Sequence, residues 1–335
     1  MHLRMMNNQA NLSRYNPNKC FFYGLKSRGD LERFLLLHQN QLRNADRLVC
    51  YQSKSVPKKN GKMREINDPS PKLKAMQRKI LVQLKRLDLP EWIFSGVKSR
   101  SYIDNAKYHL GAPYMVKIDI EKFYPNCRSI RAYQLFVNGF KTSTDIAGIL
   151  TKLLTYKQSF PTGTPTSQMI AFLAYNDMFC EMEQKASERG YRFSLFVDDI
   201  TFSSSTEIPR EFIKDIEAVL NKYGHSLNMR KVKTYYSTQD KLVTGAVVTR
   251  DSKMAVPNRQ RQLIVADLNE IKCLFSLAKA SGADCKSEAN SQLLVKWRSA
   301  TGRLQSARQI ESGLYSGIKL YYLQVQKYLK NEHLL

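Results

Sequence analysis

The chain has 335 residues, and 43% of them are apolar, which is enough to bury a sizeable core divided among two or three subdomains. Lysine and arginine total 53 against 29 aspartate and glutamate residues, so the formal net charge is +24, which is typical of a protein with a polyanionic partner such as nucleic acid. No apolar run approaches about 18 residues, and residues 1–20 lack an apolar segment, so we expect neither a transmembrane helix nor a signal peptide.

The N-terminal part is expected to combine helices with one hairpin. Residues 1–50 are predicted to be helical, because an acidic turn precedes an apolar face. Asn60-Gly61 is a strong hairpin signal, and it brings Lys62 and Arg64 to one face of the strand that follows, since side chains i and i+2 point the same way. These donors suit a phosphate clamp, although an exposed basic turn is the commoner explanation of such a segment.

A second group of elements follows this hairpin. Residues 69–87 are predicted to form a helix whose basic outer face suits a phosphate backbone. Residues 92–113 are predicted to be mostly loop and turn, and His109 within them has the pattern of a structural histidine. The apolar residues of 114–125 predict a strand that enters the core, and Asp119 closes this strand, where its side chain can reach a cleft.

The middle of the chain is predicted to be largely helical. Residues 128–157 are expected to form two helices, and a long helix is expected over 169–188. The loop between them, residues 160–168, is rich in turn-forming residues. Gly163 in this loop permits close approach of the backbone to a ligand.

Residues 196–202 place two adjacent carboxylates, Asp198 and Asp199, in a run of apolar and β-branched residues that favours strands. Burying a bare carboxylate is costly unless its charge is offset, and a divalent cation would offset it. A surface turn is the alternative, but a tight strand-turn-strand that presents both carboxylates to a metal fits better. With Asp119 on a neighbouring strand, the three carboxylates would complete a site for two metal ions about 3.5–4 Å apart.

The C-terminal part is predicted to be mainly helical. An amphipathic helix over residues 211–223 precedes a basic segment, residues 228–234, whose lysines could protonate a departing pyrophosphate or bind a backbone. Residues 242–248 are predicted to form another strand. Beyond Pro257 the chain is predicted to be helical, and tyrosines interleave with its basic residues. That pattern suits single-stranded or loop RNA, and it also suits an ordinary helical core.

The order of these segments resembles that of a reverse transcriptase. Phe196-Val197-Asp198-Asp199 is similar to the family's Tyr-x-Asp-Asp box, with Phe in place of Tyr. Lys62-x-Arg64 matches the fingers motif, and Asp119 with Phe123 and Tyr124 matches the first catalytic motif. Residues 162–167 match the loop written Gln-Gly-x-x-x-Ser, with Thr162 in place of Gln and with Gln168 where Pro is usual. Lys233-Thr234 matches the later lysine motif.

Two further motifs are similar to signatures of retron reverse transcriptases. Residues 105–109 fit the Asn-Ala-x-x-His signature, and residues 243–245 fit the Val-Thr-Gly signature. The resemblance therefore rests on seven motifs in family order, spread over roughly residues 55–262.

The resemblance implies an α+β fold, the right-hand polymerase with fingers, palm and thumb. The implied division is an N-terminal helical segment over residues 1–50, the first part of the fingers over 51–112, a palm with interleaved fingers helices over 113–250, and a helical thumb that binds RNA over 251–335. The palm would be an antiparallel sheet packed on helices.

The resemblance also implies a role for each matched residue. Two Mg²⁺ ions would be held by the three aspartates and the carbonyl of Ile120, and dNTP would be the substrate. The residues implied for catalysis are Asp119, Asp198, Asp199 and Lys233, with Lys231 as the second choice for the general acid. The residues implied for binding dNTP are Lys62, Arg64, Tyr124 and Gly163, with Tyr124 as the steric gate. The residues implied for contact with nucleic acid are Asn105, His109, Val243, Thr244 and Gly245.

By the same resemblance, the partner would be a structured non-coding RNA that is both template and primer. Synthesis would start at a guanosine 2′-OH and give a branched RNA–DNA molecule (msDNA) used in anti-phage defence. The protein partner would be a separate effector or toxin, and no association with a membrane is expected. A higher-order ribonucleoprotein assembly is also expected. The six cysteines form no Cys-x-x-Cys pair, so zinc is not expected, and reduced thiols fit the bacterial cytoplasm. The alternatives are another defence-associated or group II-like reverse transcriptase with different priming, and a catalytically inactive RNA-binding scaffold.

Overall fold

The chain folds around two separate hydrophobic cores. The structure, a computed structural model, describes residues 12–57, 61, 63–280 and 283–335, with the backbone alone for 283–287. Contacts between Cα atoms divide the chain into two units. The first comprises Met1–Arg100 and Tyr114–Thr234, and the second comprises Ser101–Pro113 and Tyr235–Leu335. Each unit contains one of the two cores.

The first unit is rich in helices. They are α1 (Arg28–Leu35), α2 (Pro71–Leu84), α4 (Phe123–Asn126), α5 (Ser129–Gln134), α6 (Thr144–Leu154), α7 (Ser167–Ala174), α8 (Asn176–Ser187) and α9 (Arg210–Lys222), with 3₁₀ segments η1 (Ser13–Tyr15), η2 (Pro17–Lys19), η3 (Gln41–Leu48) and η5 (Met229–Lys231) and a π segment η4 (Leu135–Gly139). Within the predicted helical segment 1–50, α1 is the α-helix among the described residues, and the rest of the helical structure is 3₁₀.

The prediction of one long helix over residues 169–188 is wrong, because the chain breaks at Tyr175 into α7 and α8. Tyr175 is 1% exposed, and its hydroxyl accepts a hydrogen bond from the backbone N–H of Arg128 at 3.0 Å. The break therefore occurs at a buried residue that is bonded across the unit, a contact that periodicity along the chain does not reveal.

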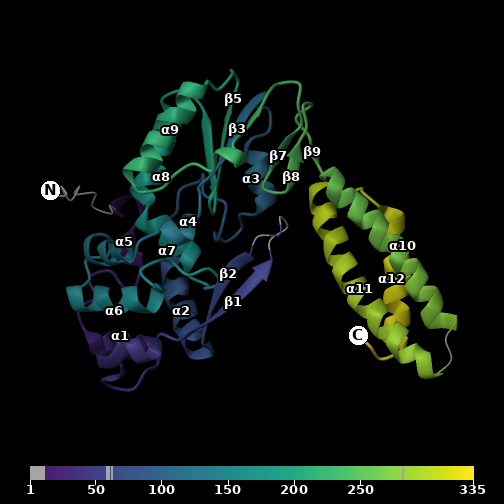
Figure 1. The fold of residues 1–335 in the computed structure, drawn as a ribbon, viewed down its shortest axis with the longest axis horizontal. Helices are drawn as coiled ribbons and strands as arrows, with labels where there is room; N and C mark the ends of the chain where they lie inside the picture. The colour runs from purple at the N-terminus through teal and green to yellow at the C-terminus, as the bar shows by residue number, and fades with distance from the viewer. Residues whose placement is uncertain (1–11, 58–60, 62, 281–282) are drawn as a thin grey trace. The chain divides into compact units, whose positions relative to one another are not determined.

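A four-stranded sheet lies at the centre of the first unit, in the order β4 (Arg192–Phe196), β5 (Asp199–Ser204), β3 (Tyr114–Asp119) and β6 (Lys233–Tyr235). The β3–β5 and β4–β5 pairs are antiparallel. Helix α8 packs beside β4 and α9 (Figure 1). The sequence predicted that the strand ending at Asp119 lies beside the strand that follows Asp198, and the pairing of β3 with β5 confirms it.

The strands β1 (Tyr51–Pro57) and β2 (Met63–Pro69) form the predicted antiparallel hairpin, which pairs Pro57 with Met63. Helix α2 begins directly after it. The Ser70 hydroxyl accepts a hydrogen bond from the backbone N–H of Leu73, and Pro71 occupies the first helical position, a common way to start a helix.

The second unit combines a small sheet with four helices. They are α3 (Tyr102–Tyr108), β7 (Lys241–Val243), β8 (Ala246–Val248), β9 (Met254–Ala255), α10 (Asn258–Ala280), α11 (Ala283–Ile310) and α12 (Ser316–Asn331), with strand order β7-β8-β9. The three long C-terminal helices confirm the prediction of a helical C-terminal region. Among the described helices, none combines the length and the apolar character needed to cross a membrane.

One sequence prediction for this unit is wrong and another is refined. Residues 92–113 are mostly loop and turn, as predicted, but they also contain the short helix α3. The Ser101 and Asp104 side chains each accept a bond from the other's backbone N–H and cap its first turn. Residues 242–248 form a hairpin rather than one strand. The chain reverses at Thr244 and Gly245, whose φ angles are 46° and 101°.

Candidate active site

The two adjacent carboxylates lie at a strained two-residue turn. Phe196 pairs with Asp199 across the β4–β5 hairpin, so Val197 and Asp198 form the turn. Val197 has a φ of +63°, a conformation that β-branched residues rarely adopt. Its backbone N–H donates to the Ser95 hydroxyl at 2.8 Å, which supports the turn. This is the predicted tight strand-turn-strand, and such strain is typical of functional sites.

Asp119 joins this pair from the neighbouring strand. It is the direct cross-strand partner of Asp199, and side chains of directly opposed residues lie on the same face of an antiparallel sheet. The preceding pair, Ile118 and Ile200, points to the other face and is buried in the core. The apolar face of β3 and β5 thus fixes the register that brings the two carboxylates together.

The three carboxylates perturb one another. Burial, together with the negative charges of Asp119 and Asp199, raises the pKa of Asp198 to about 6. Burial also raises the pKa of Asp199, against the opposing charge of Lys117. Buried like charges at close range are unfavourable without added positive charge, so this cluster favours binding of a cation.

Two side chains from the segment after α9 hold Asp119. The Lys231 ammonium lies 2.7 Å from Asp119 Oδ1, and the Asn228 amide donates to Oδ2 at 3.2 Å. Burial lowers the pKa of Lys231, but the hydrogen bond and the charge of Asp119 outweigh it and raise that pKa. Lys233, the first choice for the general acid, is exposed on β6, and its charge acts on Lys117. The structure therefore places the second choice, Lys231, on the carboxylate.

Sequence reasoning missed Asn228, Lys117 and Ser95 as parts of this site. Asn228 is the first residue of the basic segment, and its backbone N–H also donates to the Asp119 carbonyl at 2.9 Å. Lys117 stands two residues before Asp119, so strand alternation alone would have put it on the same face. Nothing in the sequence around Ser95 indicated its bond to the turn.

The predicted nucleotide-binding residues lie on separate segments of the first unit. Tyr124 is half-buried on α4, and burial together with the negative charge of Asp198 raises its pKa well above the ordinary value. Its ring is thus near the carboxylate of the turn. Arg64 is exposed on β2, and Lys62 lies outside the described residues. The backbone of Ile120 pairs with Leu227 in an isolated bridge.

The loop that contains Gly163 is bonded to β2. The Thr162 hydroxyl donates to the Glu65 carbonyl at 2.6 Å, and the Asn67 N–H donates to the Thr162 carbonyl at 2.8 Å. Gly163 has a φ of +98°, and a Cβ there would lie 2.7 Å from Ile66 Cγ2. Only glycine therefore fits at this contact, and Thr162 joins the loop to the strand that carries Arg64.

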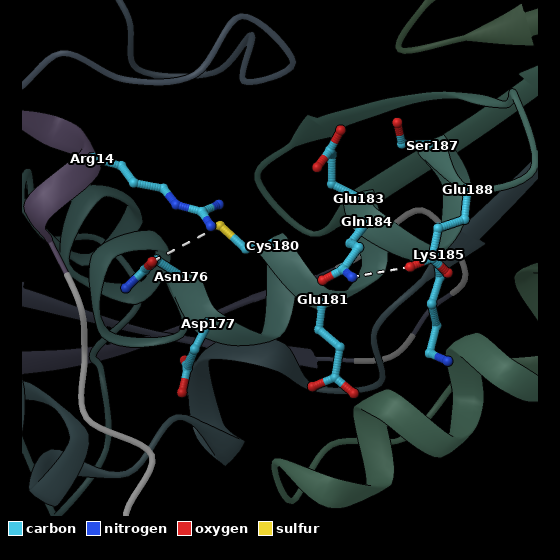
Figure 2. Close-up of a pocket in the computed structure, with 10 residues that line it drawn as sticks. All are labelled: Arg14, Asn176, Asp177, Cys180, Glu181, Glu183, Gln184, Lys185, Ser187 and Glu188. Carbon is cyan, nitrogen blue, oxygen red and sulfur yellow. Dashed lines mark hydrogen bonds between the residues drawn. The ribbon is translucent and has the colours of Figure 1, made fainter.

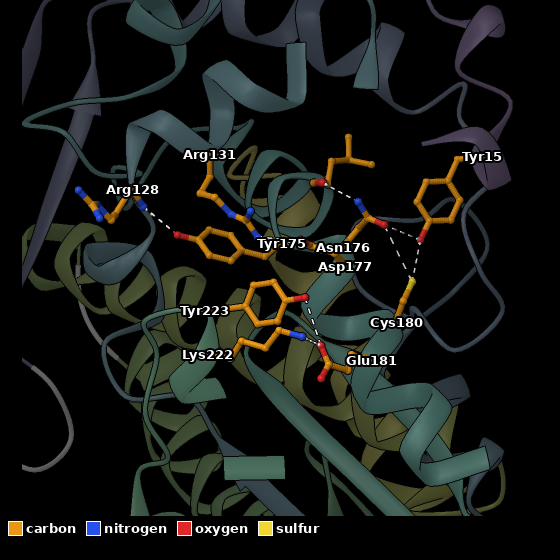
Figure 3. A network of polar contacts seen from close by, with 11 residues as sticks. Tyr15, Arg128, Arg131, Tyr175, Asn176, Asp177, Cys180, Glu181, Lys222 and Tyr223 are labelled. Atoms are coloured by element: carbon orange, nitrogen blue, oxygen red, sulfur yellow. Dashed lines mark hydrogen bonds and ion pairs between the residues drawn. The ribbon is translucent and has the colours of Figure 1, made fainter. Parts of the chain in front are cut away.

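A polar and aromatic network supports the segment after β3 (Figure 3). The Arg131 guanidinium contacts both Asp177 carboxylate oxygens, at 2.9 and 3.1 Å, and lies over the Tyr175 ring. Tyr175 in turn packs against Phe123, the neighbour of Tyr124, with ring centroids 6.3 Å apart. This network stabilises the position of α4 and hence of the Tyr124 ring.

The two retron-like signatures meet in the second unit. The Asn105 amide donates to the Thr244 hydroxyl at 3.4 Å, and that hydroxyl donates to the Tyr102 carbonyl at 2.8 Å. Asn105, His109 and Val243 are buried, while Gly245 is exposed in the turn. The bonds of Thr244 to Asn105 and Tyr102 thus join α3 to the β7–β8 hairpin, and contact of the signature residues with nucleic acid stays a prediction.

The residues present fit a divalent cation that is completed by substrate. Among the residues described, no group of three or more His, Cys, Asp or Glu side chains is already arranged to hold a metal ion. Mg²⁺ commonly takes only one or two carboxylates together with substrate phosphates and water. Asp119 and Asp198 carry hard oxygen atoms of this kind, and burial together with the charges of Asp119 and Asp199 raises the pKa of Asp198, so added positive charge is favourable here.

A hollow of about 840 Å³ elsewhere on the first unit is not this site (Figure 2). It follows α8 and is lined by Asp177, Glu181, Glu183 and Glu188 among others, and none of the three aspartates of the turn and β3 belongs to its lining. Its carboxylates would repel a triphosphate or a nucleic acid backbone, both of which are negatively charged.

The comparisons with known proteins agree with the motifs. The model of the reverse transcriptase (RNA-dependent DNA polymerase) family matches residues 56–265. Retron Se72 reverse transcriptase of Salmonella heidelberg is 30% identical over 67% of this chain and 59% of its own length. Retron Ec86 reverse transcriptase of Escherichia coli is 27% identical over 63% of this chain and 66% of its own.

The chain thus matches less than two thirds of the length of these two relatives. A solved structure of apo telomerase from Candida tropicalis aligns with 82% of this chain and 60% of its own, with a TM-score of 0.48 and 12% identity. The family match spans more than half of the chain and contains both strands of the carboxylate cluster. The chain belongs to the reverse transcriptase (RNA-dependent DNA polymerase) family, and its α+β architecture is that family's right-hand polymerase fold.

Proposed function

We propose that this protein is an RNA-directed DNA polymerase that adds dNTP to a growing DNA strand on an RNA template. The observation that carries the proposal is the convergence of Asp119, Asp198 and Asp199 from two strands and a strained turn. Family membership supports the same reaction. The fingers, palm and thumb boundaries given above stay part of this proposal.

Each side chain of the site then has a defined task. Asp119 and Asp198, with the Ile120 carbonyl, would hold two Mg²⁺ ions, which when bound stabilise the attacking and leaving oxygens of nucleotidyl transfer. Asp199 pairs electrostatically with Lys117 and adjusts the charge of the site. Lys231 is placed to protonate the leaving pyrophosphate, with Lys233 as the alternative.

The nucleotide pocket follows from the neighbouring residues. The Tyr124 ring near Asp198 would exclude a ribose 2′-OH, so dNTP is preferred over NTP. Arg64, together with Lys62, would bind the triphosphate, because arginine and lysine donors suit phosphate oxygens. Gly163 lets the backbone of its loop approach the nucleotide.

The finer assignment is to the retron type. The Asn-Ala-x-x-His and Val-Thr-Gly signatures and the relatives named as retron reverse transcriptases support it. The template and primer would be a structured non-coding RNA, synthesis would start at a guanosine 2′-OH, and the branched RNA–DNA product would serve anti-phage defence. An effector protein, a larger ribonucleoprotein assembly and a place in the bacterial cytoplasm belong to the same proposal.

Primer extension tests the polymerase reaction. Asp198→Asn keeps the size of the side chain but removes its charge. Each 1.4 kcal/mol of transition-state stabilisation that is lost lowers the rate tenfold. We expect a loss of about 10³-fold in dNTP addition with Mg²⁺, since metal-ion stabilisation amounts to several kcal/mol. Asp251→Asn, at an exposed turn, is the control and should retain wild-type rate. Undiminished synthesis by the Asp198 variant would refute the site assignment.

Sequencing the nucleic acid that co-purifies with the protein tests the retron assignment. A branched molecule that joins short DNA to an internal RNA 2′-OH is the expected result. An unbranched product, or DNA linked to the protein itself, would instead identify a reverse transcriptase with another way of priming. A protein that binds RNA but extends no primer would be an inactive scaffold.

A further inference from the structure

The segment that leads to Ser95 adds an edge to the central sheet of the first unit. The Leu195 N–H donates to the Trp92 carbonyl at 2.8 Å, and the Phe94 N–H donates to the Leu195 carbonyl at 3.0 Å. This added edge runs parallel to β4. The bond from the Val197 N–H to the Ser95 hydroxyl, at 2.8 Å, continues the same ladder by one step into the carboxylate turn.

The segment that carries Ser95 is itself held in place. The Arg100 guanidinium donates to the Ile93 carbonyl at 2.8 Å and also to the Pro90 carbonyl. Ser95 is 8% exposed, so water competes little for its hydroxyl. Val197 needs such a fixed acceptor, because a β-branched residue at a φ of +63° is strained, and strain of this kind persists only where the surrounding structure holds it.

Gln168 packs against this segment from α7. Gly96 has a φ of +71°, and a Cβ there would lie 2.9 Å from Gln168 Nε2, so the carboxamide occupies the space beside residue 96 where a side chain would stand. Ser95, Gln168 and Val197 line one narrow hollow beside the turn, together with apolar side chains of α7 and β4. Gln168 stands where the family usually has Pro, and proline has no carboxamide to make this contact.

Helix α7 connects this contact to the nucleotide loop. The helix begins directly after the loop that is bonded to β2. A path of contacts thus runs from that loop through Gln168 and Gly96 to Ser95. From Ser95 one hydrogen bond leads to Val197, and Asp198 follows directly in the chain. The end of this path therefore sets where the Asp198 carboxylate stands.

We propose that Ser95 and Gln168 are positioning residues for the carboxylate turn. Ser95 holds Val197 in its left-handed conformation, and Gln168 keeps Ser95 in place by packing on Gly96. Both residues act through the backbone that carries Asp198. The consequence for catalysis rests on the proposed polymerase function, in which a turn that is no longer held binds Mg²⁺ more weakly and so slows dNTP addition.

Hydrogen exchange of the whole protein, without metal or nucleotide, tests whether Ser95 holds the turn. Mass spectrometry of the peptide that contains residues 195–199 follows the Val197 N–H. Ser95→Ala should speed its exchange about three- to tenfold, the factor that corresponds to one hydrogen bond. Ser204→Ala is the matched control, because Ser204 is also buried and its hydroxyl accepts the Thr206 N–H at 3.1 Å, but at the opposite end of β5 from the turn.

The Mg²⁺ dependence of primer extension tests the positioning role. Ser95→Ala should raise the Mg²⁺ concentration that gives half the maximal rate about three- to tenfold, with a smaller change in the rate at saturating Mg²⁺. Ser95→Thr keeps the hydroxyl and should restore the wild-type dependence. A serine needed only for stability, as expected for Ser204, would change the melting temperature and leave the Mg²⁺ dependence as it is.

Two variants of Gln168 test the second residue and cover the event that Ser95→Ala fails to fold. They are Gln168→Ala and Gln168→Pro, and the first turn of a helix, where residue 168 is the second residue of α7, tolerates proline. Both should shift the Mg²⁺ dependence in the same direction as Ser95→Ala. Combining Gln168→Ala with Ser95→Ala should add no further shift, because residues that act through one contact are not additive.

The two readouts separate the ways in which the proposal can fail. If Ser95→Ala and Ser204→Ala give the same exchange at Val197, Ser95 does not hold the turn and the proposal is refuted. If the exchange changes but the Mg²⁺ dependence does not, or if the shifts of Ser95→Ala and Gln168→Ala add, the positioning role is refuted. A wild-type protein that extends no primer would instead refute the proposed function, and the exchange experiment would still decide whether Ser95 and Gln168 hold the turn.

Discussion

At the scale of single residues, the pairing of Lys231 with Asp119 distinguishes two lysines that differ little in the sequence. Lys231 and Lys233 stand two positions apart in one basic segment. The 3₁₀ segment η5 brings Lys231 to Asp119 at 2.7 Å, whereas Lys233 enters β6. The Lys231 side chain is 60% exposed, so the ion pair adds little stability, and under the proposed function it would place a proton donor at the site.

We therefore expect Lys231→Ala to slow nucleotide addition by about 10²-fold, since a positioned general acid typically contributes that much or more. Lys233→Ala should change the rate by less than about threefold, because Lys233 is exposed on β6 and the side chains bonded to the Asp119 carboxylate are Lys231 and Asn228. Single-turnover rates of primer extension measure both, and the burst of pyrophosphate release gives the same comparison. A larger defect in the Lys233 variant would restore the first assignment.

A second residue, His225, links the site to stability. It is 3% exposed, both of its ring nitrogens lack a partner among the described residues, and the rings of Phe123 and Tyr175 pack against it. Burial, with the nearby positive charge of Arg131, lowers its pKa from 6.5 to about 4. The folded state thus holds the neutral imidazole.

The sign of the pH dependence follows. Below pH 6.5 the unfolded chain binds a proton at His225 that the folded chain does not, so stability is present above pH 6.5 and falls as the pH decreases toward 4. The full effect is roughly 3 kcal/mol. The raised pKa of Asp198, about 6, acts in the opposite direction in the same pH range, in the wild type and in any His225 variant. We therefore expect the urea midpoint of the wild type, measured relative to that of His225→Phe, to fall between pH 7.5 and 5. An unchanged pH response in that variant would contradict this assignment.

At the scale of elements, the loop before α7 is held to the β1–β2 hairpin by hydrogen bonds and close packing. The Thr162 hydroxyl and the Thr162 carbonyl both form hydrogen bonds with the backbone of β2. At Gly163, Ile66 and Asn67 leave no room for a side chain. A change in this loop therefore displaces the strand that carries Arg64. The Thr162 hydroxyl, which stands where the family usually has Gln, performs a structural task here.

Gly163→Ala tests this coupling. The added Cβ would lie 2.7 Å from Ile66 Cγ2 at a φ of +98°, which costs on the order of 1–3 kcal/mol. We expect the KM for dNTP to rise several-fold, with a smaller change in kcat. Gly190→Ala is the matched control, because Gly190 also has a positive φ of +70° but nothing lies within 4 Å of its Cβ position. Equal KM values in the two variants would show that the loop does not control the nucleotide pocket.

At the scale of the whole molecule, a net charge of +24 favours association with a polyanion, and under the proposed function that polyanion is nucleic acid. A protein that neutralises six to ten phosphates loses roughly 10³- to 10⁵-fold in affinity between 50 and 200 mM salt. We expect a loss of that order for a structured RNA, measured by filter binding or fluorescence anisotropy across a salt series. A nearly flat salt dependence would mean that base contacts, rather than the charge, dominate binding.

The sequence determined a large part of this protein without any coordinates. Alternation of apolar residues placed the strands that carry Asp119 and Asp199, because the buried face of a strand must repeat every second residue. Helical periodicity predicted that the chain beyond Pro257 is helical, and three long helices lie there. The motifs around the carboxylates resembled those of reverse transcriptases, and the family match confirms that resemblance.

Only the tertiary structure decided how distant segments complete the site. The choice of Lys231, the bonds of Asn228 to Asp119 and of Ser95 to the turn, the break at Tyr175 and the meeting of Asn105 with Thr244 all join residues that lie far apart in the chain. Local propensity reports what one segment prefers. It carries no record of which hydrogen bonds and charges the folded chain brings together, and these contacts set the charge and geometry of the site.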